Sequence, residues 1–270
     1  MGFISEIFGY ILNFLYEQFN NYGIAIIIFS VLLRIILIPI TIKQQKSLKK
    51  NAKLQKEMKE IQTKYKSNPE KLNQETIDLY KREKMSPFSG CLSGILQIII
   101  ILSVFWLVSK PLTYMKKINP EIIEKYSQEL KEEGVNSSYT EIAIINKKAA
   151  EDPEVYINMN FLGLNLAQIP TRSGDWKAFI IPVLYVLVSV ISLRITNPTP
   201  KKKDGEEKNS EDEFDPMAQM NKNMNLMFPV MYLAVALIAP LGLALYWLMN
   251  SLLMIIERLA LNKMLKDEEE

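Results

Sequence analysis

Long apolar runs alternate along the chain with polar, charged segments. The run from Ile24 to Ile42 has 19 residues, close to the 20 or so that a helix needs to cross a bilayer. This pattern predicts an all-α polytopic membrane protein with five transmembrane helices. The expected spans are 22–42, 87–109, 177–195, 223–239 and 241–257, with the last apolar run ending at about Ile256.

Residues 1–21 place apolar side chains at helical spacing between polar ones. This favours an amphipathic helix lying at the membrane interface, and a spanning helix is the alternative.

The basic segment 43–84 predicts an antiparallel helical hairpin. Leu54, Met58, Ile61 and Tyr65 recur at spacings of 4, 3 and 4 residues, which is typical of a helical seam. A turn signal at 67–69 then precedes a second helical stretch.

The remaining segments are a long loop, a linker and a tail. Within the loop 110–176 we expect helices near 120–133 and 138–150, and an apolar stretch at 161–170 resting on the membrane surface. The linker 196–222 is too polar to fold alone, and the tail 258–270 ends in acidic residues.

Charge distribution predicts the orientation of the chain. Segment 43–84 carries 13 Lys and Arg against 6 Asp and Glu, so we expect it to be cytoplasmic. Alternation then places the N-terminus and the loop 110–176 outside, and the linker and C-terminus inside.

Composition excludes several classes of function. The chain has no histidine, which removes His-dependent catalysis, and its one cysteine allows no intrachain disulfide. A nucleotide-binding loop and a metal or redox cluster are both absent from the sequence. With a net charge of +2, there is no nucleic-acid signature. We expect neither an enzyme nor a cofactor or metal.

Arg34 is the main candidate functional residue, because it lies near the middle of the first span. A search of the other apolar spans finds no carboxylate to pair with it, and a lone cation there costs about 2.5–3.5 kcal/mol. We expect a hydrated cavity, open to the cytoplasm, in which Arg34 attracts anions. Ser30 lies one turn earlier on the same face, and Gln97 could project from the second span. Snorkelling of Arg34, or bonding to carbonyls, is the alternative.

Trp247 and Asn250 share a face of the fifth span. The alternatives for them are interfacial anchoring and bonding between helices. The basic hairpin could be a solvated face, a contact for anionic lipids or a docking surface for a cytoplasmic partner.

Two motifs carry a resemblance to a known family. They are SPFSGCLSGILQ at the second span and PLGLALYWLMNSLLMIIE at the fifth, after a first span with one arginine and a basic hairpin. From about Tyr22 to Ile256 the chain resembles the YidC/Oxa/Alb family of membrane protein insertases, in its short bacterial form.

The resemblance implies a bacterial plasma-membrane protein that inserts nascent membrane proteins. Five spans would enclose a hydrophilic groove where Arg34 attracts acidic client segments, near Ser30, Gln97, Trp247 and Asn250. The hairpin 43–84, including Lys49, Lys50 and Lys53, would recruit clients. The family also implies assistance to the Sec translocon, whereas the acidic tail does not favour ribosome docking.

The competing function is a small anion channel or transporter that uses Arg34 as its selectivity charge. A transporter favours internal inverted repeats, and the sequence has none that we detect. An intramembrane enzyme would lack a base.

Overall fold

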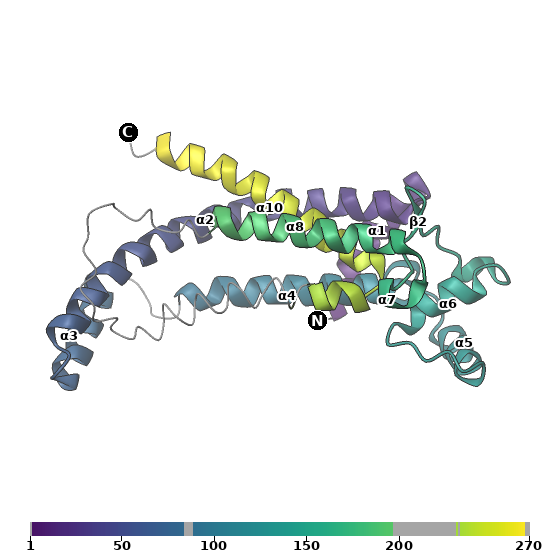
Figure 1. Cartoon of the computed structure of the whole chain (residues 1–270), viewed down its shortest axis with the longest axis horizontal. Helices are drawn as coiled ribbons and strands as arrows, with labels where there is room; N and C mark the ends of the chain where they lie inside the picture. The colour runs from purple at the N-terminus through teal and green to yellow at the C-terminus, as the bar shows by residue number, and fades with distance from the viewer. Residues whose placement is uncertain (1, 84–88, 197–230, 232, 268–270) are drawn as a thin grey trace. The chain divides into compact units, whose positions relative to one another are not determined.

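The computed structural model describes residues 2–83, 89–196, 231 and 233–267 (Figure 1). Within these residues helices dominate, and there is one two-stranded sheet. The chain folds into two compact units, Ile35–Val104 and Gly2–Arg34 with Phe105–Glu270. The elements in chain order are α1 (Gly2–Phe19), α2 (Tyr22–Lys64), α3 (Pro69–Arg82), α4 (Ser89–Ser109), η1 (Leu112–Lys116), α5 (Pro120–Glu132), α6 (Thr140–Lys148), η2 (Pro153–Val155), β1 (Asn160–Phe161), β2 (Leu164–Asn165), α7 (Pro170–Ser173), η3 (Trp176–Phe179), α8 (Ile180–Thr196) and α10 (Leu241–Asp267).

Two described segments are long and apolar enough to cross a membrane, Tyr22–Lys46 in α2 and Leu241–Leu261 in α10. They contain the expected spans 22–42 and 241–257. Shorter apolar helices, Ile98–Ser109 and Trp176–Ser192, lie where the second and third spans were expected. The linker 196–222 and most of the fourth span, 223–239, lie outside the described residues.

In the Ile35–Val104 unit, α2 continues past the expected end of the first span. It passes through Pro39 and runs to Lys64 without a break, so the first span and the first helix of segment 43–84 form one helix. Proline removes one backbone hydrogen bond, but within a bilayer the remaining backbone groups gain most by staying helical.

The turn after α2 leads into α3. Asn68 caps α3 by accepting a hydrogen bond from the Lys71 N–H (3.1 Å), and proline is suited to the first helical position. Three contacts join α3 to the last turns of α2: the ion pair between Arg82 and Glu57, the Tyr65 hydroxyl on Glu75 (3.3 Å), and the Thr76 hydroxyl on the Met58 sulfur (3.6 Å).

In the other unit, α8 and α10 pack side by side and run in the same direction (Figure 1). The rings of Tyr185 and Trp247 lie 6.0 Å apart between centroids. Seven residues later on both helices, the Ser192 hydroxyl contacts the Met254 sulfur at 3.9 Å. Contacts that advance together along both helices identify a parallel pair.

Segment 110–176 folds into a cap over the N-terminal ends of α2 and α10. Asn158 O accepts from the Tyr22 N–H at the start of α2 (3.0 Å). Gln168 O and Leu166 O accept from the first N–H groups of α10, on Leu241 and Gly242 (both 2.9 Å). Since the first N–H groups of a helix have no partner within it, these bonds satisfy both helix ends and hold them at the same side of the unit.

Part of the apolar stretch at 161–170 forms a β-hairpin with Asn160. Asn160 pairs with Asn165 and Phe161 with Leu164 in antiparallel register. The two residues of the turn, Leu162 and Gly163, have φ angles of 50° and 79°, as the favoured two-residue hairpin turns require. Leu166 and Ala167 behind the hairpin are buried.

The helix α1 packs through small side chains. Ser5 and Gly9 are buried with Leu12 and Tyr16, and a Cβ at Gly9 would collide with the Tyr114 carbonyl of η1. The opposite face exposes a stripe of large apolar and aromatic side chains: Phe3, Ile7, Tyr10 and Phe14. One face therefore packs on the protein, and the other offers an apolar stripe.

Candidate functional site

Arg34 on α2 forms an ion pair with Glu257 on α10. Their side chains are only 13% and 7% exposed. The expectation that Arg34 has no carboxylate partner was therefore wrong. Glu257 was missed because the search for a carboxylate covered only the apolar run of the fifth span, which ends at Ile256, although the expected span 241–257 includes the glutamate as its last residue. In the structure α10 continues to Asp267 and keeps Glu257 on the packed helix.

The ion pair lies deep along both helices. At 1.5 Å per residue, Arg34 is about 18 Å along α2 from Tyr22, and Glu257 is about 22 Å along α10 from Gly242. Tyr22 and Gly242 are themselves neighbours, since a Cβ at Gly242 would lie 3.5 Å from the Tyr22 ring. The two helices are thus parallel, and the pair joins them about 20 Å from the helix ends that the cap holds.

Arg34 Nε and the Glu257 carboxylate are in direct contact. Among the described residues, Arg34 Nε and both Glu257 carboxylate oxygens have no hydrogen bond of normal geometry. A buried ion pair recovers the cost of leaving water only when further hydrogen bonds satisfy its polar atoms. The Glu257 carboxylate is therefore an incompletely satisfied partner for Arg34.

Ser30 lies one helical turn before Arg34 and is 4% exposed. Its hydroxyl donates to the Ile26 carbonyl of the same helix (2.7 Å). That bond leaves the oxygen lone pairs free to accept. The structure places Ser30 on the Arg34 face of α2 as the spacing predicted.

Asn250 and Trp247 occupy different surroundings on α10. Asn250 and Glu257 are seven residues apart, so they fall on one helix face, and Asn250 is half-buried. Trp247 is also half-buried, and its ring packs against Tyr185 of α8. Asn250 thus lies on the same helix face as Glu257, and Trp247, three residues before Asn250, contacts α8 through Tyr185.

Four predicted site residues lie on helices whose side chains are outside the described part of the structure at these positions. They are Gln97 on α4 and Lys49, Lys50 and Lys53 on α2.

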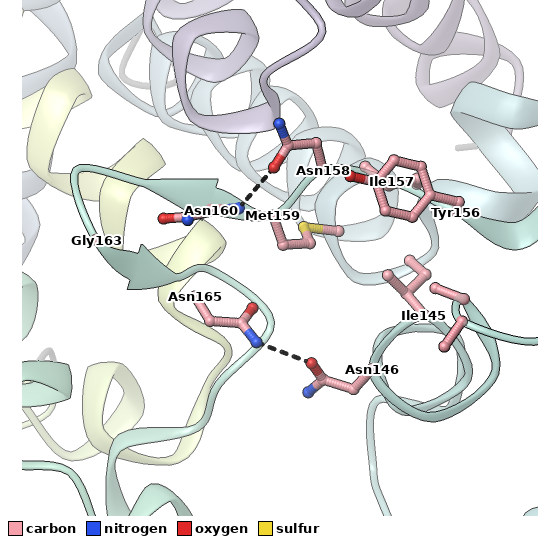
Figure 2. Close-up of a pocket in the computed structure, with 11 residues that line it drawn as sticks. Ile145, Asn146, Tyr156, Ile157, Asn158, Met159, Asn160, Gly163 and Asn165 are labelled. Carbon is pink, nitrogen blue, oxygen red and sulfur yellow. Dashed lines mark hydrogen bonds between the residues drawn. The ribbon is translucent and has the colours of Figure 1, made fainter. Parts of the chain in front are cut away.

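A pocket of about 480 Å³ lies in the cap, apart from Arg34 (Figure 2). Four asparagines line it, from α6, the β-hairpin and the irregular segment leading into the hairpin. The Asn165 amide donates to the Asn146 side chain (3.0 Å), and the Asn160 backbone N–H donates to the Asn158 side chain (3.2 Å). These bonds join parts of the cap to one another and give the amides a structural role.

The cap also holds a buried carboxyl group. Glu141 on α6 is 6% exposed, and it accepts bonds from the Thr113 N–H (2.9 Å) and hydroxyl (2.6 Å). Burial raises the pKa of Glu141 above its ordinary value of 4.5, and the Thr113 bonds oppose the rise. Among the described residues, no group of three or more His, Cys, Asp and Glu side chains could hold a metal ion.

The sequence is similar to a family of membrane proteins over most of its length. The family described as "60Kd inner membrane protein" matches residues 14–269. The membrane protein insertase YidC of Fusobacterium nucleatum is 27% identical over 255 residues, covering 94% of this chain and 93% of that protein. Proteins of the same name from Endomicrobium trichonymphae and Geobacter metallireducens are 31% and 29% identical, over 95% and 93% of this chain. The chain spans 39% and 35% of those two longer relatives.

Proposed function

Because the chain belongs to the 60Kd inner membrane protein family, which includes the YidC/Oxa/Alb proteins, we propose that it is an insertase and chaperone for integral membrane proteins. The observation that carries the proposal is the position of Arg34. This cation lies deep in a helix that can span a membrane, and its partner is a carboxylate with unsatisfied oxygen atoms.

In the proposed mechanism, five spans enclose a hydrated groove that is open to the cytoplasm. Arg34 binds acidic residues of the client segment that must cross the membrane, because opposite charges attract strongly in a low-dielectric groove. Ser30, Gln97, Trp247 and Asn250 contact the passing client. The apolar segment of the client leaves the groove for lipid, driven by apolar burial.

The orientation of the helices supports this arrangement. The helices α2, α8 and α10 run parallel, as odd-numbered spans must when the chain crosses the membrane alternately. The cap covers the N-terminal ends of α2 and α10 through backbone hydrogen bonds. With the cap outside, the groove would be closed at its outer end, and the basic segment 43–84 would lie in the cytoplasm.

The hairpin 43–84 has the proposed role of recruiting clients. Lys49, Lys50 and Lys53 supply positive charge directly after the first span, where anionic lipid headgroups also lie. The exposed stripe of α1, defined above, suits a helix that rests on the outer surface of the membrane. We further propose that the protein acts on nascent membrane proteins, alone or beside the Sec translocon.

The anion-channel alternative is weakened by the same ion pair. A selectivity charge must present a net positive potential to passing anions. Glu257 neutralises Arg34 in the structure, so the resting protein has little of the potential that a channel would use.

Reconstitution in liposomes tests the proposed function. The client is a small single-span protein with an aspartate in its translocated segment, and the matched client has asparagine there. A hydrogen bond to a charged group contributes about 1.5–3 kcal/mol, so Arg34→Ala should lower insertion of the aspartate client about tenfold or more. Arg34→Lys keeps the charge and should retain part of the activity. Equal insertion by Arg34→Ala and wild type would contradict the proposal, and rapid anion flux through the purified protein would favour the channel.

A further inference from the structure

We propose that Glu257 is a specificity-determining residue that competes with client carboxylates for Arg34. Between clients it holds the arginine, and a client must displace it to enter. The inference rests on the proposed function, because it takes Arg34 as the group that binds the client's acidic residues.

The first support is the chemical identity of the two competitors. Arg34 would bind a client through a carboxylate, and the structure already places a carboxylate against it. Both members of the pair are buried, so another anion reaches Arg34 only if Glu257 moves or shares the arginine. A guanidinium has five N–H donors in a planar fork, which allows transient sharing while one carboxylate replaces the other.

The second support is that Glu257 competes from a fixed position. It is attached to α10, which packs along α8 and reaches the cap at its first turn. A group tethered in this way acts at an effective concentration on the order of millimolar or higher. A client with one weakly held acidic residue therefore faces constant competition, whereas several acidic residues close together rebind before Glu257 returns.

The third support is that the Glu257 carboxylate makes no hydrogen bond of normal geometry among the described residues besides its contact with Arg34. The resting contact therefore does not gain the full stabilisation that a buried ion pair can have. Arg258 follows Glu257 directly, and the apolar segment of α10 ends at Leu261. The displaced carboxylate can therefore turn toward the polar end of the helix, where ions are better solvated.

Competition of this kind predicts an effect on client choice. When the binding-competent state is only partly populated, the apparent affinity equals the intrinsic affinity multiplied by the populated fraction. If Arg34 is free of Glu257 in about one molecule in ten, removing the competitor raises apparent affinity for a single carboxylate roughly tenfold. A client with several acidic residues gains less, since it already displaces Glu257 efficiently.

The test uses the full chain in liposomes and three versions of one single-span client, with no, one or three aspartates in the translocated segment. The readout is the ratio of insertion of the one-aspartate client to that of the three-aspartate client. Glu257→Gln should raise this ratio severalfold, up to roughly tenfold, and leave the client without aspartate unchanged. A ratio equal to that of wild type would overturn the proposal. So would an equal loss for all three clients, which would make Glu257 a structural partner only.

A second variant covers the case in which Glu257→Gln does not fold. Glu257→Asp keeps the charge but shortens the side chain, so it should shift the ratio in the same direction by a smaller amount. Thermal unfolding of each variant establishes that it is folded, and if Glu257→Gln is not, Glu257→Asp decides alone.

Arg34→Ala separates this inference from the proposed function. If Arg34→Ala inserts the aspartate clients as well as wild type does, the proposed function fails and the inference with it. If Arg34→Ala inserts the aspartate clients poorly while the Glu257 variants leave the ratio of one-aspartate to three-aspartate insertion unchanged, only the inference about Glu257 fails.

Discussion

The Tyr22 N–H at the start of α2 donates to the Asn158 carbonyl of the cap at 3.0 Å. The same asparagine secures the α1–α2 corner with its side chain, whose Nδ2 donates to Asn20 O (2.8 Å) while its Oδ1 accepts from the Asn160 N–H (3.2 Å). One residue thus joins the cap to the start of the helix that carries Arg34, and the position of Arg34 depends on a cap residue far away in the sequence.

Replacing Asn158 with alanine removes both side-chain bonds and keeps the backbone bond to Tyr22. Each hydrogen bond contributes about 0.5–1.5 kcal/mol, so the free energy of unfolding should fall by about 1–3 kcal/mol. Thermal unfolding in detergent measures the change. Asn160→Ala is the matched control, because the bonds of Asn160 to Asn158 and Asn21 use backbone atoms. Equal losses for the two variants would contradict this role of the Asn158 amide.

Gly9→Ala should displace α1 from η1, because the added Cβ would collide with the Tyr114 carbonyl. Backbone cannot move aside as a flexible side chain can, and overpacking of this kind costs about 1–3 kcal/mol. We expect a lower melting temperature and faster proteolysis within α1. Gly2→Ala is the control, since a Cβ there meets no atom within 4 Å. A Gly9→Ala protein as stable as the Gly2→Ala protein would mean that α1 does not pack on η1 as closely as the structure has it.

The elements that the sequence predicted correctly have local causes. The apolar runs of α2 and α10 predict long helices from length and composition alone, and both helices are present. Asn119 followed by Pro120 starts α5, with the asparagine side chain accepting from the Glu121 N–H (3.0 Å). Both features depend on residues within a few turns of one another, so a single sequence contains the information.

The features that were missed depend on contacts between distant residues. Arg34 and Glu257 meet only because α2 and α10 pack in parallel, and no local pattern connects them. Glu257 could have been suspected from its place seven residues after Asn250 on one helix face, because it is the last residue of the expected span 241–257. The β-hairpin was hidden by Leu162, because a branched apolar residue rarely adopts a positive φ.

Glu141 should make the stability of the cap depend on pH. Its pKa is raised in the folded state, mainly by burial, so between pH 4.5 and the raised value the folded state binds more protons than the unfolded chain. The free energy of unfolding therefore falls as pH rises through that window and is level above it. Thermal unfolding measured across this pH range should show the free energy of unfolding of the wild type declining as pH rises. Glu141→Gln should give a flatter dependence on pH. Glu121→Gln, at an exposed position, should retain the decline, and a wild-type profile for Glu141→Gln would contradict the assignment.

The parallel packing of α8 and α10 can be tested with paired cysteines. In a Cys91→Ala background, Ser192→Cys with Met254→Cys should cross-link efficiently with a short thiol reagent, because the native side chains are in contact at 3.9 Å. Tyr185→Cys with Met254→Cys is the matched control. Tyr185 lies seven residues before Ser192, about 10 Å along α8, so this pair should cross-link poorly. The opposite preference would mean that α8 and α10 are not in this parallel register, and the orientation proposed for the groove would lose its support.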